Sequence, residues 1–167
     1  SESIVSSSND AWSIQEITKA AVTMDGKYLH CLVRGVVSGS GESRVYWIVC
    51  RLGSNEVNSG MTIVRSHWLS RFAMPDQVRV LGLVSCENDG VYAAVSANDT
   101  VILMALVPVN GDETNHIIQE VDLPARKIPD LLPSMMERDT VTHGCFLVAS
   151  TGIGVRARFL PQENEYK

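Results

Sequence analysis

The chain of 167 residues has a net charge of −5, an ordinary apolar content of 45% and few aromatic residues. This length is most simply one domain with added segments, and it can bury a core without disulfides or metal. A tight, nonspecific nucleic-acid binder is usually basic overall, and a membrane span needs about 20 consecutive apolar residues, so the composition argues against both.

The N-terminal region combines a polar stretch with a helix-like pattern. Residues 1–11 are rich in serine, which is typical of a flexible tether, and they show no secretory signal pattern. Either Asp10 or Ser13 is a candidate helix cap, and Ser13 with Glu16 matches the capping box that begins many helices. The apolar residues Ile14, Ile17 and Ala20 follow at helical spacing, so we predict a short helix before the first strand.

Five β-rich runs occupy the centre of the chain, with one short helical pattern among them. The runs are Tyr28–Val37, Arg44–Leu52, Met61–Arg65, Val78–Val84 and Val91–Val107, and the last divides or bulges near residues 97–100. Between the third and fourth runs, Trp68 and Phe72 are four residues apart, which predicts a helix over 68–74 that plugs one end of a barrel. Three strands, a helix and two strands is the order of an OB-fold. We therefore predict a mostly all-β protein, built on a five-stranded Greek-key barrel of OB type with one short helix, over residues 12–108.

The C-terminal region, residues 109–167, begins as a proline-rich connector. Three prolines within 123–133 favour extended chain there. The segments 142–148 and 153–160 then predict a β-hairpin joined at 149–152. This hairpin tail is expected to pack on the barrel or on a partner, or to begin a second module.

The residues that usually form metal and catalytic sites are dispersed. Cys31, Cys50, Cys86 and Cys145 form no close pair, which predicts buried free thiols in a reducing compartment. Residues 152–157 match the pattern G-x-G-x-x-A, which is part of a dinucleotide-binding fingerprint. Such a site also needs a helix here and then a second strand with an acidic residue, and the sequence offers neither, so a hairpin turn is favoured. We expect no metal, no cofactor and no catalytic centre.

Charge is unevenly distributed along the chain. Residues 27–79 contain seven basic and three acidic residues, a net of +4, whereas residues 87–139 contain three basic and ten acidic residues, a net of −7. OB-type surfaces bind single strands with aromatic platforms and basic side chains. The candidate nucleic-acid-binding residues are Arg34, Arg44, Tyr46, Trp47, Arg51, Arg65 and Arg79. Because alternate strand residues point to opposite faces, one subset is expected to be core.

Two runs are apolar on both faces, whereas a strand of a small barrel exposed to water usually alternates apolar and polar residues. In 78–84 and 101–107, apolar side chains occupy successive positions. Large exposed apolar patches are rare on monomers, so the outward members should be covered by the C-terminal tail, by a helix or by another chain. We expect the tail at 117–160 to cover some of them and a protein partner to cover the rest. The candidate partner-binding residues are Leu81, Leu83, Ile102, Met104 and Leu106. We expect another protein subunit as partner, with weak single-strand binding at most and no membrane contact.

Three features together resemble the OB domains of single-strand-binding complexes. They are the run Val33-Arg-Gly-Val-Val37, the V-x-V-x-G-x-V pattern of Val78–Val84 and the helical pattern between the third and fourth strands. The resemblance is to the small subunits of replication protein A and of telomere-capping assemblies, and it covers roughly residues 12–107. It implies a subunit that assembles partners and contacts nucleic acid weakly. We expect an intracellular location, in the nucleus rather than the cytoplasm, with an organelle as the alternative.

Three functional hypotheses follow. The first is a non-catalytic OB-fold scaffold subunit of a nucleic-acid-handling complex, acting mainly through protein–protein contacts. The second is a direct binder of single-stranded DNA or RNA. The third is an all-β structural or viral protein unrelated to nucleic acid.

Overall fold

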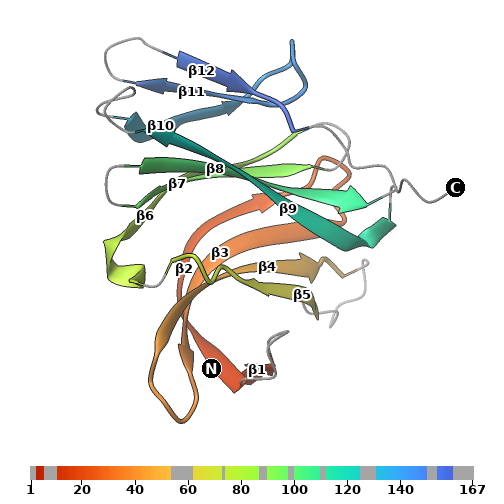
Figure 1. Cartoon of the computed structure of the whole chain (residues 1–167). Helices are drawn as coiled ribbons and strands as arrows, with labels where there is room; N and C mark the ends of the chain where they lie inside the picture. Colours follow the sequence, from red (N-terminus) through yellow and green to blue (C-terminus); the bar gives the residue numbers. More distant parts are fainter. Residues whose placement is uncertain are drawn as a thin grey trace, which may run out of the picture. The chain divides into compact units, whose positions relative to one another are not determined.

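The computed structural model describes residues 3–5, 11–53, 62–72, 74–86, 90–97, 100–109, 112–124, 131–149 and 154–159. In these residues the regular structure is antiparallel β-sheet, with one 3-10 turn and no α-helix (Figure 1). The predicted all-β class is therefore confirmed. The chain divides into two compact units, one of residues 1–22 and 26–78, the other of residues 23–25 and 79–167. The boundary predicted at residue 108 lies inside a strand of the second unit.

The first unit is a five-stranded sheet whose strands follow one another in chain order. They are β1 (Ser3–Val5), β2 (Ala11–Val22), β3 (Tyr28–Val37), β4 (Ser43–Arg51) and β5 (Thr62–Trp68). Each strand pairs antiparallel with the next. The turn between β3 and β4 contains Gly39 and Gly41 at φ values of 95° and 70°, which glycine adopts without steric cost. A 3-10 turn, Pro75–Gln77, follows β5.

One face of this sheet carries the apolar core of the first unit. Trp12, Cys31, Val33, Tyr46, Ile48 and Cys50 are buried in one cluster, with Ile14, Leu29, Ile63 and Trp68 packed against it. The β3–β4 register places Val33 opposite Tyr46 and Cys31 opposite Ile48, so alternate residues of both strands meet on the same face. Burial of this face explains why both strands are rich in β-branched and aromatic residues.

The helix predicted near residues 13–21 is wrong, because this segment is strand β2. Two register shifts, between Ile14 and Glu16 and between Ile17 and Lys19, each add one residue to β2 relative to β3. Consequently Ile14, Ile17 and Ala20 lie opposite residues 35, 33 and 31, which share one face of β3. A spacing of three thus places these residues on one face of a doubly bulged strand, as it would on one face of a helix.

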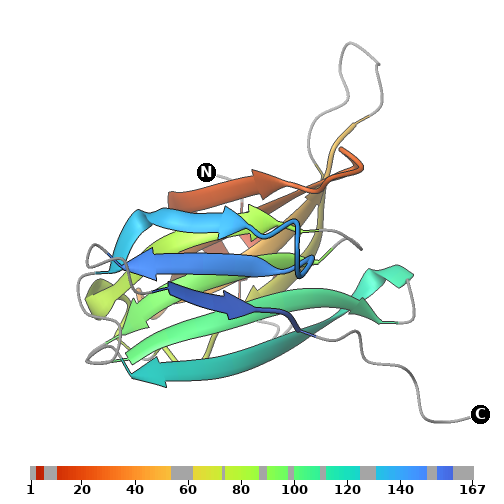
Figure 2. The same ribbon diagram turned by 90° about the horizontal axis from the view of Figure 1, so that it is seen from above.

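The second unit contains two sheets. The first has β6 (Val78–Ser85), β7 (Val91–Ala97), β8 (Thr100–Val109) and β9 (Asp112–Pro124); the second has β10 (Leu131–Arg138), β11 (Cys145–Ala149) and β12 (Gly154–Ala157). The blue strands of the second sheet lie over the green strands β7 and β8 (Figure 2). One buried cluster joins the sheets, formed by Leu81, Cys86, Tyr92, Ala94, Val101, Leu103, Ala105, Met136, Cys145 and Leu147.

A glycine sets the separation of these two sheets at β6. An added Cβ on Gly82 would lie 2.7 Å from Cβ and 2.8 Å from Sδ of Met136 on β10. Such distances are shorter than van der Waals contact, so a side chain at position 82 would force the sheets apart. The glycine in the V-x-V-x-G-x-V pattern therefore serves close packing between β6 and β10.

The five β-rich runs are confirmed as strands, but they do not form one barrel. They correspond to β3, β4, β5, β6 and the pair β7 and β8, with Ala97 opposite Thr100 at the break. The first three belong to the five-stranded sheet and the others to a four-stranded sheet, so the OB-type Greek-key arrangement is corrected to three antiparallel sheets.

The helix predicted over 68–74 is also wrong. Trp68 is the last residue of β5 and pairs with Tyr46, and the amide of Phe72 donates to the carbonyl of Leu69 in a turn. The predicted C-terminal hairpin is confirmed, since β11 and β12 pair from Cys145–Ala157 to Val148–Gly154.

Candidate functional site

The two aromatic residues predicted as base platforms lie in the core. Tyr46 and Trp47 are both fully buried. The Tyr46 ring stacks on the ring of Trp12, and the Trp47 indole N–H donates to Nδ1 of His30 at 3.0 Å. Neither ring presents a face on which a base could stack, so both are removed from the candidate nucleic-acid surface.

Two of the candidate arginines are held by neighbouring groups. The guanidinium of Arg34 lies 3.4 Å from Asp76 and 3.9 Å from Glu16, and it donates to the carbonyl of Pro75. Arg44 is buried, with its guanidinium 2.9 Å from Glu42 and 3.7 Å from the centroid of the Trp68 ring. These contacts engage both guanidinium groups and hold them against the surface of their own unit, with side chains only 30% and 11% exposed.

The remaining candidates, Arg51, Arg65 and Arg79, are exposed. Arg65 lies opposite Val49, which shares a face of β4 with Arg51, so two cations project from one face of neighbouring strands. Burial, followed by the charge of Arg65, lowers the pKa of His67 on the same strand. Arg79 belongs to the second unit.

The five residues predicted to bind a partner are buried by the chain itself. Leu81 and Leu83 are 2% and 9% exposed, and Ile102, Met104 and Leu106 are exposed by 3% or less. The β7–β8 register places the last three opposite Val95, Ala93 and Val91, which are fully buried as well. These five residues are therefore corrected to core positions of the folded chain, not members of an exposed apolar surface.

The four cysteines are buried free thiols, as the sequence predicts. Burial, with a smaller contribution from Cys50, raises the pKa of Cys31 to about 11. Burial is also the main cause that raises the pKa of Cys145 to about 12, followed by the proximity of Cys86 and Asp139. Thiols with raised pKa values are poor nucleophiles at neutral pH. Among the described residues, no group of three or more His, Cys, Asp or Glu side chains could hold a metal.

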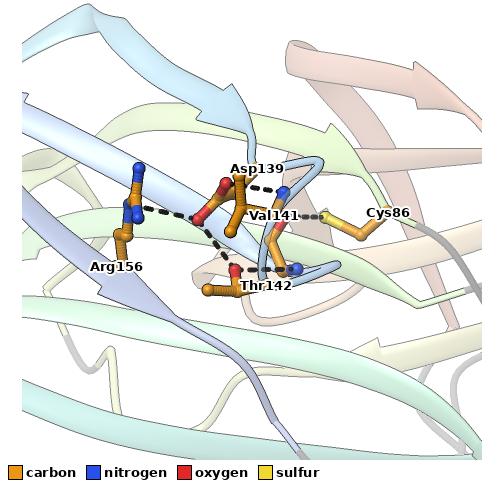
Figure 3. Close-up of polar contacts among 6 residues, drawn as sticks. Cys86, Asp139, Val141, Thr142 and Arg156 are labelled. Carbon is orange, nitrogen blue, oxygen red and sulfur yellow. Dashed lines mark hydrogen bonds and ion pairs between the residues drawn. The ribbon is translucent and has the colours of Figure 1, made fainter.

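A polar network organises the turn between β10 and β11 (Figure 3). The buried carboxylate of Asp139 accepts hydrogen bonds from the Val141 amide at 3.0 Å and the Thr142 hydroxyl at 2.8 Å. Nε of Arg156, on β12, lies 3.3 Å from the same carboxylate. The Thr142 hydrogen bond is the largest of the effects that lower the pKa of Asp139. This network fixes the turn to β12.

The face of the β10–β12 sheet opposite the shared core contains an apolar hollow of about 340 Å³. Cys145 and Leu147 point into the core, so Phe146 and Val148 point to the opposite side, which we call the outer face. Arg156 pairs with Phe146, and Gly154 pairs with Val148. The hollow is lined by Phe146, Val148, Gly154, Val155 and Arg156. It combines an apolar floor, a missing side chain at position 154 and one cation.

Strand β12, which borders the hollow, is anchored at its end. The Phe159 amide donates to the Tyr92 hydroxyl at 2.7 Å, and that hydroxyl donates to the Phe159 carbonyl at 3.4 Å. The two rings also meet edge to face. Burial is the main cause that raises the pKa of Tyr92, which keeps the phenol protonated as a donor. The segment that follows β12 is thus anchored to β7 through Tyr92.

Sequence reasoning did not identify this outer face. The sequence predicts Phe146 and Val148 in the first strand of the C-terminal hairpin and Gly154 and Arg156 in the second, without a binding role for any of them. A partial signal existed in residues 145–148, because all four are apolar although only one face of a strand can point into the shared core. The location of the outer face depends on which sheet covers residues 145 and 147, and no local pattern encodes that.

Comparison with protein-family models, with curated proteins and with solved structures found no match. Within the part of the chain that the structure describes, no helix has the length and apolarity needed to cross a membrane.

Proposed function

We propose that the chain is a non-catalytic β-sheet protein that acts through protein–protein contacts as one subunit of a larger assembly. The observation that carries this proposal is the apolar hollow on the outer face, next to the edge strand β12. Apolar surface beside an unpaired strand edge is a common means by which a sheet binds another chain. The surface proposed by sequence reasoning is core, so the contact is assigned to the outer face instead.

The position of Phe146 supports this assignment. It occupies the middle strand of its sheet, between Glu137 on β10 and Arg156 on β12, and it is half-buried. An aromatic ring surrounded by charged side chains matches the usual anatomy of a protein interface, an apolar centre with a polar rim.

A co-purification experiment tests the proposal. A tagged wild-type chain, recovered from its native source and analysed by size-exclusion chromatography with light scattering, should carry a partner in a fixed ratio. The Phe146→Lys variant should be recovered without it. Val121→Lys is the matched control, because Val121 is an exposed apolar residue on β9, away from the hollow. Recovery of the wild-type chain alone would contradict the proposal.

Direct single-strand binding is the alternative, and one observation favours it. Arg51 and Arg65 remain exposed on one face of β4 and β5. Their phosphate contacts would give an affinity that falls steeply with salt, whereas the buried aromatics provide no base stacking. If the double variant Arg51→Gln/Arg65→Gln binds a labelled single-stranded oligonucleotide as well as the wild type does, this alternative is excluded.

A further inference from the structure

We propose that β12 is the docking edge for an extended segment of a partner protein, which adds as a fourth strand beside β12 and carries a carboxylate and an apolar residue two positions apart. The inference rests on the proposed function, because it names the kind of partner that the outer face would bind.

The edge strand β12 has a regular pairing register. In the sheet order β10–β11–β12, only one side of β12 is paired among the described residues. Its register with β11 runs without a shift, whereas β10, the opposite edge of the same sheet, is irregular between Leu131 and Met136. Bulges at an edge discourage pairing with another chain, and a regular edge permits it. β12 is therefore the edge of this sheet that can accept a strand.

Two arginines place positive charge beside that edge. Arg156 uses Nε for Asp139, and its side chain is 63% exposed, so the terminal nitrogens remain as donors. Exposed Arg158 adds a second cation two residues further along. A residue directly opposite Arg156 on an added strand would lie about 5 Å away, within reach of a two-pronged guanidinium–carboxylate pair. The chemistry at this position thus selects an acidic residue.

The apolar hollow is lined in part by β12 itself. Gly154 and Arg156 lie on the same face of β12, two residues apart. The residue of an added strand opposite Gly154 would therefore share a face with the acidic residue, at a distance of two positions. It would meet Phe146 and Val148 where a side chain at 154 is missing. An apolar residue fits that place.

Fluorescence anisotropy with the full chain tests the inference. The probe is a labelled peptide of sequence Thr-Val-Thr-Glu-Thr-Val-Thr. Its two Val residues lie on the same face as Glu, one on each side, so the peptide presents an apolar residue to the hollow whether it pairs parallel or antiparallel to β12. One control peptide, Thr-Thr-Val-Glu-Val-Thr-Thr, has the same composition but places Val and Glu on opposite faces. A second replaces Glu by Lys. A third carries N-methyl groups on alternate amides, which removes the backbone donors needed for pairing.

Two variants test the two halves of the docking surface. Arg156→Gln removes the cation, and we expect the affinity for the probe to fall about tenfold or more. Gly154→Val fills the hollow without touching Asp139, and we expect a similar loss. An added Cβ at 154 would lie 3.3 Å from the Leu147 carbonyl oxygen and 3.7 Å from Val148, so the fold should accept it with a small adjustment. Arg79→Gln, which removes an exposed cation on β6, should leave binding unchanged.

The outcomes separate the hypotheses. Binding of the probe that is weakened by both variants, and lost with all three control peptides, supports the inference. Absence of binding at millimolar peptide, equal binding of the control peptides, or binding that both variants retain would overturn it. A dimer that Gly154→Val dissociates would also overturn it, because the edge would then serve a second copy. If the peptide fails but a co-purified partner is still lost with Phe146→Lys, the proposed function survives and only the partner class is wrong.

Discussion

The ring of Trp12 lies parallel to the ring of Tyr46, with 3.8 Å between their centroids and 4° between their planes. These residues come from β2 and β4, which are not neighbours but both pair with β3. They meet because Gly35 of β3 lies beneath them and has no side chain. The stack therefore joins three strands at one point of the first unit.

Gly35→Ala should destabilise the protein through this stack. The added Cβ would lie 2.5 Å from Cε3 of Trp12 and 3.0 Å from Cε2 of Tyr46, so the rings must move. Overpacking of this kind costs about 1–3 kcal/mol of the free energy of unfolding, measurable by urea denaturation. In Gly90→Ala the nearest atom would be 3.4 Å away, so this control should retain wild-type stability. Equal midpoints for both variants would show that the stack yields freely.

Trp47→Phe should cost stability rather than nucleic-acid affinity. The substitution removes the indole donor to Nδ1 of His30 in a buried site, which leaves that nitrogen without its 3.0 Å hydrogen bond. The loss of a buried partner costs about 1–3 kcal/mol, to be measured by urea unfolding. Trp68→Phe, which keeps a ring beneath Arg44, should cost less. A Trp47→Phe variant of wild-type stability that loses oligonucleotide affinity would reinstate Trp47 as a base platform.

Asp139 should make stability depend on pH in the acid range. Its hydrogen bonds from Thr142 and Val141 and the charge of Arg156 lower its pKa in the folded chain. The stabilisation is therefore present above the ordinary Asp value of about 3.9 and is lost as pH falls through the lower folded value.

Asp139→Asn should consequently unfold at lower urea than the wild type at pH 7, with a difference that shrinks below about pH 4. Glu137→Gln, which removes an exposed carboxylate from β10, is the control and should show no such convergence. A constant gap between Asp139→Asn and wild type from pH 7 to pH 3 would contradict the assigned role.

The four thiols should resist modification until the chain unfolds. Burial raises the pKa of Cys31 to about 11 and that of Cys145 to about 12, so little thiolate exists at pH 7.5. Ellman's reagent should react slowly with the native protein and with four thiols in denaturant. Rapid reaction of one thiol under native conditions would place a reactive cysteine where the structure has a core residue.

Local pattern predicted the strands well because their composition is unambiguous. The run Tyr28–Val37 coincides with β3, and the apolar run 145–148 belongs to a paired hairpin strand. The errors arise where tertiary pairing changes what a spacing means. Ile14, Ile17 and Ala20 resemble a helix face only because two bulges alter the period of β2.

The grouping of strands into sheets could not be predicted from the sequence. The third and fourth β-rich runs, which form β5 and β6, both read as strands in the sequence, yet the two strands belong to different sheets. The same limit explains the misplaced interface. Met104 lies in a continuous apolar run, so its sequence context does not show which face of the strand is exposed. Only the folded chain shows that successive residues of this strand are all buried. The outer face, by contrast, combines Phe146 with Arg156, residues from different strands whose register brings them together.

Hydrogen–deuterium exchange of the chain, alone and with saturating Thr-Val-Thr-Glu-Thr-Val-Thr peptide or with a co-purified partner, shows directly whether β12 accepts an added strand. An added strand would pair with the backbone amides on the side of β12 that faces away from β11, and it would slow their exchange. We predict that protection increases in Gly154–Ala157 of β12 and that exchange in β5, the edge strand beside Arg51, is unchanged. Protection confined to Thr62–Trp68, with β12 exchanging as in the free chain, would contradict it.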